Sequence, residues 1–457
     1  MAPPLTIRNL TSTPLNVRQL ERYPAPSGAI HSLNRFTGNI TSFTNNVTET
    51  EIPDNAEPYA REDVDIRVEP FAVVNTDKAA SERADDILRV TIELEGQRYR
   101  IDVPLPVAYT RTFTPLVPDP RFELTAVYVK DDTFLTVYSS RDLASWMQHL
   151  RDPTPLSALS IPGTHNSPTC HKALPSVRCQ AVSPRAQLDN GVRFFDIRVQ
   201  PERPEDSGHD GLILVHGVFP ISLTGNKYFR DLVNETVSWL EGHGSETVIF
   251  SVKREGPGEH NDAQLARILR QHYANNDRWW TEPRIPRLGE ARGKIVLMRR
   301  FALADELRGE HDGRGWALDA ENWAYNTPND RHGEVVVQDF CEVLDTENID
   351  AKLRYATEHL ERAGCEACGD ENAPAPPLYL NFLSASNFWK VGCWPEKIAA
   401  ILNPAVTKHL ATKHVQSGQG DWGTGVVICD WVGESGDWDL VRCIVGMNSK
   451  LMVRQGQ

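Results

Sequence analysis

From Asp142 onward, the chain alternates short apolar runs with amphipathic helical patterns. The runs are hydrophobic throughout, as in strands that are buried on both faces. The clearest helical pattern has apolar residues at i, i+3 and i+4 spacing: Phe229, Leu232, Val233, Val237 and Leu240. Strands that alternate with helices in this way favour parallel pairing. The pattern therefore predicts an α/β fold, a (β/α) barrel of the TIM type, with catalytic side chains at the carboxyl ends of the strands.

The first part of the chain has a different pattern of apolar and polar residues. Apolar residues alternate with polar ones at 88–94 and again at 99–103, and Glu95-Gly96 forms a turn between them. This alternation indicates a hairpin with one buried face. At 457 residues the chain exceeds what one hydrophobic core organises. We therefore expect two domains: an all-β, sandwich-like domain at residues 1–140 that carries no chemistry, and the barrel at residues 141–457.

Five side chains that are suited to catalysis stand at the ends of apolar runs: His165, Asp196, Arg198, His216 and Asp430. One histidine can remove a proton while another donates one. Arginine can hold a phosphate through two parallel hydrogen bonds. Because a strand has a period of two, Asp196 and Arg198 share one face. The alternative for this acid–x–arginine pattern is an ion pair on a solvated strand.

The charge balance narrows the choice of partners. A formal net charge of −14 argues against nucleic acid and against docking on anionic membranes by charge alone. No apolar run approaches the length that spans a bilayer, and the first residues do not resemble a secretory signal. We expect a cytoplasmic protein that associates transiently with membranes. The eight cysteines are expected to be reduced thiols, and Cys365 and Cys368 have zinc-like spacing without a second pair.

The motifs at 161–167, 194–198 and 215–217 resemble the phosphatidylinositol-specific phospholipase C superfamily. The resemblance runs from about 145 to 451 and includes the segments at 288–297, 337–339, 378–382, 403–404 and 428–430. It is closer to the metal-independent bacterial type than to the calcium-dependent signalling type. Arg198 and Lys253 stand where the calcium type has acidic ligands, and a cation cannot ligate calcium. The resemblance therefore implies a reaction without metal or other cofactor. It also implies that the TIM-type barrel is distorted.

The resemblance also implies roles for the catalytic residues. His165 would remove the proton of the inositol 2-hydroxyl, and His216 would protonate the diacylglycerol oxygen. Arg198 would stabilise charge on the phosphate. Asp196 would lie near the acid histidine, and Asp430 would orient the base histidine.

Further positions match residues that bind the substrate in the family: Lys253, Arg300 and Asp339. Asn166 departs from the bacterial pattern, which has an aspartate there, but an amide can still hydrogen-bond the attacking hydroxyl or the arginine. The aromatic residue that follows the aspartate in the family is displaced, because Phe340 stands one place early. Each of these residues has the alternative of being an ordinary surface charge.

An aromatic segment at 387–395 matches a rim loop of the family. Phe388, Trp389 and Trp394 are expected to insert into lipid at the level of the headgroups. The alternative is that two of the three pack in the core.

Together these features predict cleavage of phosphatidylinositol, or of glycosyl-phosphatidylinositol, to diacylglycerol and a cyclic inositol phosphate. The expected partners are a phosphoinositide or related phospholipid and a membrane surface. One alternative is a phosphodiesterase of the same fold that acts on another lipid or on a glycerophosphodiester. Another alternative is a lipid-binding protein without catalysis.

Overall fold

The computed structural model describes residues 4–24, 52, 56–80, 86–103, 110–140, 142–206, 208–346, 348–366, 374–415 and 420–456. The chain divides into two compact units, Met1–Ser140 and Arg141–Gln457. Each unit is described by itself below.

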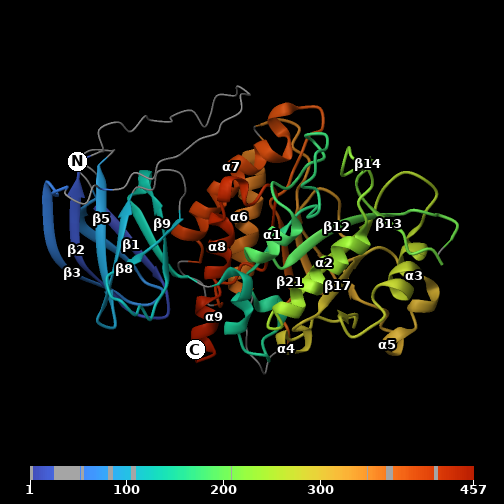
Figure 1. Ribbon diagram of the computed structural model, residues 1–457, viewed down its shortest axis with the longest axis horizontal. Helices are drawn as coiled ribbons and strands as arrows, with labels where there is room; N and C mark the ends of the chain where they lie inside the picture. Colours follow the sequence, from blue (N-terminus) through green and yellow to red (C-terminus); the bar gives the residue numbers. More distant parts are fainter. Residues whose placement is uncertain are drawn as a thin grey trace. The chain divides into compact units, whose positions relative to one another are not determined.

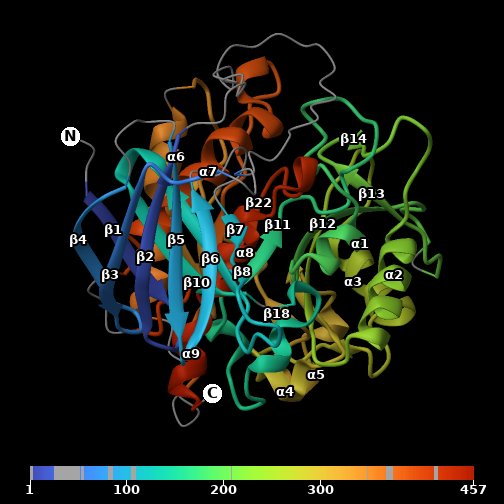
Figure 2. The same cartoon turned by 60° about the vertical axis from the view of Figure 1, so that its left-hand side comes forward.

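The first unit contains two five-stranded sheets. One has the order β4 (Val73–Ala79), β1 (Pro4–Leu10), β10 (Phe134–Ser139), β9 (Leu124–Val129) and β7 (Thr110–Thr112). The other has the order β3 (Ala60–Val68), β2 (Leu15–Tyr23), β5 (Ile87–Leu94), β6 (Gln97–Val103) and β8 (Thr114–Pro115). Apolar residues of both sheets share one buried cluster, so the sheets pack face to face, and Figure 2 shows the second sheet from its front.

The second unit is built on a curled sheet with a parallel centre (Figure 1). Its path runs from β16 (Trp279–Trp280) through β17 (Ile295–Arg300), β15 (Val248–Arg254), β12 (Phe194–Pro201), β11 (Ile161–Thr164), β22 (Val426–Cys429), β21 (Leu378–Phe382) and β20 (Val335–Asp339) to β19 (Thr327–His332). Two further strands, β13 (Leu212–His216) and β14 (Phe219–Pro220), extend from β12, and β18 (Leu318–Asp319) pairs with β17. Within the described ranges no strand pairing joins the two ends of this path, so the barrel is incomplete.

The helices of this unit are α1 (Pro184–Asp189), α2 (Phe229–Gly242), α3 (Asp262–His272), α4 (Leu288–Ala291), α5 (Glu310–Gly313), α6 (Asn348–Glu366), α7 (Pro395–Thr412), α8 (Asp439–Gly446) and α9 (Ser449–Arg454). Helices pack on both hydrophobic clusters of this sheet: α1, α2 and α3 against the outer cluster, and α4, α8 and α9 against the inner one. The expected stripe of α2 is confirmed, because Phe229, Leu232, Val233 and Leu240 are buried and Val237 packs against the same cluster. Of the described helices, none is both long and apolar enough to cross a bilayer.

Alternate residues of the central strands belong to two different cores. Phe195 and Phe250 pack outward with the helices, whereas Phe194, Ile249 and Val296 pack in a cluster on the other face, inside the curled sheet. This is the period of two expected for strands buried on both faces. On these strands, polar side chains that point inward therefore appear only near the carboxyl ends, at the mouth of the sheet.

Candidate active site

Three neighbouring strands place a row of basic side chains at their carboxyl ends. Arg198 of β12 pairs in register with Lys253 of β15, and Lys253 pairs with Arg300 of β17. All three have the inward parity of the strand residues in the inner core. These three basic residues therefore stand at neighbouring positions on adjacent strands.

His165 follows β11, and both of its ring nitrogens have partners. Nδ1 lies 2.9 Å from Oδ1 of Asp430, which follows β22. Nε2 lies 2.9 Å from Nη2 of Arg198. Because a guanidinium only donates, Nε2 accepts a hydrogen bond, and Nδ1–H donates to the carboxylate. His165 is thus arranged as a neutral ring whose lone pair faces Arg198.

The carboxylate of Asp430 also makes His165 a stronger base. Burial alone would lower the pKa of His165, but the charge of Asp430 outweighs burial and raises the pKa above the usual value for histidine. The orienting position expected for Asp430 agrees with this contact.

His216 ends β13 and lies beside His165. The two ring centroids are 6.1 Å apart, and the rings are nearly perpendicular at 87°. Nδ1 of His216 lies 2.9 Å from the carbonyl oxygen of Val177, which can only accept, so Nδ1 carries the proton. In both histidines Nδ1 is therefore held by an oxygen acceptor, and Nε2 is the nitrogen that can exchange a proton with a ligand.

Arg198 is anchored by a carboxylate that the motif analysis missed. Its Nη1 lies 3.0 Å from Oε1 of Glu255, and Nζ of Lys253 lies 2.9 Å from the same oxygen. The other oxygen, Oε2, accepts the backbone N–H of Gly217, next to His216, at 2.8 Å. Burial would raise the pKa of Glu255, but Arg198 and Lys253 hold it well below its usual range. Glu255 was detectable from the sequence, since it stands two residues after Lys253 and thus has the same strand parity.

Asp196 contacts other residues than expected. It is fully buried, and its oxygens lie 3.4 Å from both Arg198 and Arg300 and 3.9 Å from Nε2 of His165. Burial would raise the pKa of Asp196, but the two arginines lower it. Among the described residues the hydrogen bonds of His216 go to Val177 and Cys179 instead. Strand parity gave the face of Asp196 but not its neighbours across the sheet, and its place near the acid histidine stays a prediction.

Several buried polar atoms at this site make no hydrogen bond within the described part of the chain: both amide atoms of Asn166, Nε of Arg198, Oγ of Ser251 and Oδ2 of Asp430. Asn166 is fully buried, and its backbone is in the left-handed region at φ 42°. Its N–H donates to Asp196 at 3.2 Å, which holds the residue in this strained conformation. A concentration of unpaired polar atoms is expected where a polar ligand binds.

A second missed residue, Trp323, organises the far side of the site. The guanidinium of Arg300 lies 3.9 Å from the centroid of its indole ring, and its Nε1 donates to Oδ2 of Asp339 at 3.1 Å. Trp323 therefore joins the two expected substrate residues on β17 and β20. Phe340 instead packs against Tyr355, with ring centroids 5.2 Å apart. Trp323 lies in a loop without periodicity, so the sequence pattern gave no signal for it.

Comparison with known proteins bears out the resemblance that the sequence motifs indicated. Residues 153–301 match the family profile described as phosphatidylinositol-specific phospholipase C, X domain. Residues 153–301 of this chain thus resemble that X domain. The chain is similar to 1-phosphatidylinositol phosphodiesterase of Staphylococcus aureus strain Newman, with 27% identity over 329 residues that cover 68% of this chain and 95% of the relative. The Listeria monocytogenes protein of the same name is 26% identical over 301 residues, which cover 63% of this chain and 80% of the relative.

Solved structures of phospholipases C are similar in fold. A structure of the S. aureus protein aligns with a TM-score of 0.53 at 23% identity and covers 67% of this chain and 97% of its own. The L. monocytogenes structure aligns with a TM-score of 0.50 at 23% identity, covering 67% of this chain and 99% of its own. The expected kinship with the bacterial type is confirmed.

The aromatic segment of this phospholipase C-like chain lies only partly in solvent. Trp389 is 89% exposed and Phe388 is 38% exposed. The ring of Phe388 stacks on Phe219 of β14, with centroids 5.4 Å apart. Trp394 is half-buried, and its Nε1 donates to the carbonyl oxygen of Phe388 at 3.2 Å. Trp394 thus supports the loop, whereas Phe388 and Trp389 present apolar surface. Val218, next to β14, is also exposed, and the sequence analysis did not predict this apolar residue at the surface.

A buried thiol lies between the two histidines. Sγ of Cys179 is 3.9 Å from Nδ1 of His216, and it also lies with His165 and Asp430 in a group whose ligand atoms are all within 4.8 Å of one another. Burial would raise the pKa of Cys179, but the two histidines lower it to about 7. The Cys179 thiol is fully buried. It therefore affects the site through its charge interaction with the two histidines.

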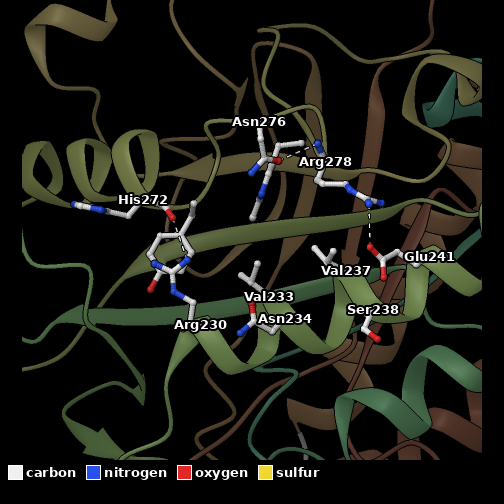
Figure 3. A pocket seen from close by; sticks show the side chains of 11 residues that line it. Arg230, Val233, Asn234, Val237, Ser238, Glu241, His272, Asn276 and Arg278 are labelled. Carbon is white, nitrogen blue, oxygen red and sulfur yellow. Dashed lines mark hydrogen bonds and ion pairs between the residues drawn. The ribbon is translucent and has the colours of Figure 1, made fainter.

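A separate cavity of about 320 Å³ lies on the outer side of the sheet, along α2 and the end of α3 (Figure 3). Its charged groups are already paired: Arg278 contacts Glu241 at 2.9 Å, and Nη1 of Arg230 donates to the carbonyl oxygen of His272 at 3.0 Å. The cavity holds none of the catalytic residues named above.

Proposed function

We propose that this chain cleaves phosphatidylinositol, or glycosyl-phosphatidylinositol, by attack of the inositol 2-hydroxyl on phosphorus. The observation that carries the proposal is the pair His165 and His216, which lie 6.1 Å apart with each Nδ1 held by an oxygen acceptor. Two such rings can address two different oxygens of one phosphodiester. The names of the bacterial relatives support the same substrate.

The reaction begins at Nε2 of His165, which accepts the proton of the 2-hydroxyl as its oxygen bonds to phosphorus. The imidazolium that forms is stabilised by Asp430 through Nδ1–H. The bond from phosphorus to the diacylglycerol oxygen breaks, and Nε2–H of His216 donates a proton to that oxygen. The products are diacylglycerol and a cyclic inositol phosphate. One proton enters the site at His165 and one leaves from His216, so the next turnover requires proton exchange with water.

Arg198 supplies the positive charge that the phosphate needs in its transition state. It contacts His165 and Glu255 at once, so a phosphate beside Nε2 of His165 also lies beside the guanidinium. Glu255 fixes the orientation of the guanidinium, and Asp196 holds Arg198 and Arg300 together. We therefore propose that the chemistry needs no metal ion and no other cofactor.

Inositol is recognised in this proposal by Lys253, Arg300, Asp339 and Asn166. A polyol needs several directional hydrogen bonds, and these side chains offer both donors and acceptors. Both amide atoms of Asn166 are buried without a partner in the described part of the chain, beside the base. Asn166 can thus accept from one hydroxyl and donate to another without losing an internal hydrogen bond.

The exposed rings of Phe388 and Trp389 are proposed to insert at a membrane surface, because indole and phenyl rings favour the headgroup region. We also propose that the two units are separate domains, 1–140 all-β and sandwich-like and 141–457 catalytic, and that the first takes no part in the chemistry. A cytoplasmic location with transient membrane association stays a prediction.

The test is turnover on phosphatidylinositol with phosphatidylcholine and glycerophosphoinositol as comparison substrates, for the full chain and for His165→Ala and His216→Ala. Each variant should lose at least about 10²-fold, as is usual for general acid–base groups. Production of cyclic inositol phosphate from phosphatidylinositol, without cleavage of phosphatidylcholine, supports the proposal. Equal rates on phosphatidylcholine would favour a phosphodiesterase without inositol selectivity, and binding without turnover would favour a lipid-binding protein.

A further inference from the structure

Three potential metal ligands converge outside the residues that match the family profile. Glu361 belongs to α6, His409 to the last turn of α7, and His414 follows α7. Oε1 of Glu361 lies 2.8 Å from Nε2 of His409 and 3.0 Å from Nδ1 of His414. The ligand atoms of all three residues lie within 4.8 Å of one another.

The hydrogen bonds of His414 indicate which of its ring nitrogens can bind a metal ion. Its Nε2 lies 3.1 Å from the carbonyl oxygen of Trp422, which can only accept, so Nε2 carries a proton. In a neutral ring Nδ1 then has a lone pair, and this lone pair faces the carboxylate oxygen of Glu361. Two acceptors at 3.0 Å need a cation between them, either a proton on His414 or a metal ion. Histidines that ligate metals donate their other N–H to a carbonyl or carboxylate in the same manner.

The surrounding backbone holds these groups in place before any ion binds. The second oxygen of Glu361 accepts the N–H of Val415 at 3.0 Å, which leaves Oε1 alone to face the histidines. Gly364, one turn after Glu361 along α6, has no room for a side chain, because a Cβ there would lie 2.3 Å from Val415 and 3.0 Å from the ring of His414. The side chain of His414 is fully buried, and that of Glu361 is 39% exposed.

We propose that Glu361, His409 and His414 bind a divalent transition metal ion of the zinc class. Two imidazoles and one carboxylate suit zinc, whereas calcium would require six or more oxygens. In a tetrahedral zinc site with bonds of about 2.05 Å, ligand atoms lie about 3.3 Å apart. The contacts at 2.8 and 3.0 Å therefore need to open by only a few tenths of an ångström. Zinc sites with three protein ligands take water as the fourth ligand, and Glu361 is the ligand with the most exposed side chain.

The ion would cross-link α6 and α7, so its effect is on stability. α7 also carries Asn403, whose Nδ2 donates to the carbonyl oxygen of Asp430 at 3.0 Å. Fixing α7 thus supports the loop that bears Asp430 without taking part in the reaction. The site is independent of the metal-free chemistry proposed above, because its ligands lie on other elements than His165 and His216.

The test uses the full chain after treatment with a strong chelator and dialysis. Zinc is then titrated by calorimetry, and thermal unfolding is followed with and without zinc. Glu361→Gln and His409→Gln each remove one ligand; Gln at 361 keeps an acceptor for Val415. His332→Gln is the matched control, since His332 pairs with Asp319 at 3.1 Å in a comparable half-exposed pair. Cys179→Ser tests the other group with suitable ligand spacing, His165, Cys179 and Asp430.

The expected result is one zinc ion per chain and a rise in the melting temperature of about 3–6 °C at a hundredfold excess over Kd. Both ligand variants should bind zinc at least about 10-fold more weakly, while His332→Gln and Cys179→Ser bind it normally. Cobalt(II) should give visible absorption bands in the unchanged chain and lose them in Glu361→Gln. The proposal is overturned if the folded chain binds no zinc, if the ligand variants bind it as well as the unchanged chain, or if only Cys179→Ser loses it.

Discussion

Replacing Asp430 by asparagine tests the base most specifically, because it removes one charge and almost no volume. Oδ1 of Asp430 accepts Nδ1–H of His165 at 2.9 Å, and its charge raises the pKa of that ring. An amide at this position no longer stabilises the imidazolium. It can also turn its NH₂ group toward Nδ1, which would move the ring proton to Nε2 and block the base.

The size of the effect follows from the contact. A hydrogen bond to a charged group contributes about 1.5–3 kcal/mol, and 1.36 kcal/mol corresponds to one pKa unit. The pKa of His165 should therefore fall by about one to two units in Asp430→Asn. Because the base acts when neutral, activity is lost as pH falls through this pKa. The acid limb of the pH profile should thus move to lower pH by about one to two units, while the plateau falls by about 10²–10⁴-fold.

The assay is kcat/KM on a short-chain, soluble phosphatidylinositol between pH 6 and 11, because the pKa of His165 is raised to about 10. The matched control is Asp319→Asn, which removes a carboxylate that lies 3.1 Å from Nε2 of His332 and also pairs with Arg299, neither of which is a catalytic residue here. This control should keep both the plateau and the acid limb. An unchanged acid limb in Asp430→Asn, with a folded protein, would refute the assignment of His165 as the base.

Three further changes test other parts of the account. Arg198→Lys should lower kcat/KM by at least about 10²-fold, since an ammonium group cannot contact Glu255 and a phosphate in one plane; a loss below about 3-fold would contradict the role of Arg198. Trp389→Ala should weaken binding to vesicles and leave turnover of the soluble substrate unchanged, because Trp389 is 89% exposed; equal losses on both substrates would contradict membrane insertion. Glu246→Gln should lower the free energy of unfolding by about 3–5 kcal/mol in chemical denaturation, because it breaks a fully buried pair with Arg193 at 2.9 Å. The exposed pair Arg278–Glu241 gives the control Glu241→Gln, with an expected loss below about 1 kcal/mol.

Local patterns were sufficient to predict the elements that carry the site. The apolar runs gave the parallel strands, and the i, i+3, i+4 spacing gave α2, because both periods are properties of a single segment. The same logic placed His165 and Asp430 at the mouth of the sheet, since each directly follows a buried strand. Their contact at 2.9 Å follows from the pairing of β11 with β22.

Features that depend on distant segments were not predictable in this way. The two-residue period of β12 predicted which face of the sheet Asp196 lies on. Its contact with Arg300, which lies two strands away on β17, could not be predicted from β12 alone. Trp323 lies in a loop whose position depends on β18 and β20. The different exposures of Trp389 and Trp394 follow from the start of α7, where the Trp394 indole folds back on Phe388. The open barrel also depends on the pairing of edge strands, which no single segment specifies.

The central claim is that Arg198 and the two histidines cleave phosphatidylinositol without a metal ion. It is tested most directly by the rate at which the purified full chain releases cyclic inositol phosphate from phosphatidylinositol, at 25 °C, in excess chelator and in millimolar calcium. The account predicts rates that agree within a few-fold, with any loss of zinc from Glu361, His409 and His414 lowering only the thermal stability. A loss of several orders of magnitude in chelator that calcium restores would contradict it, and would make Asn166 and the nearby carboxylates metal ligands.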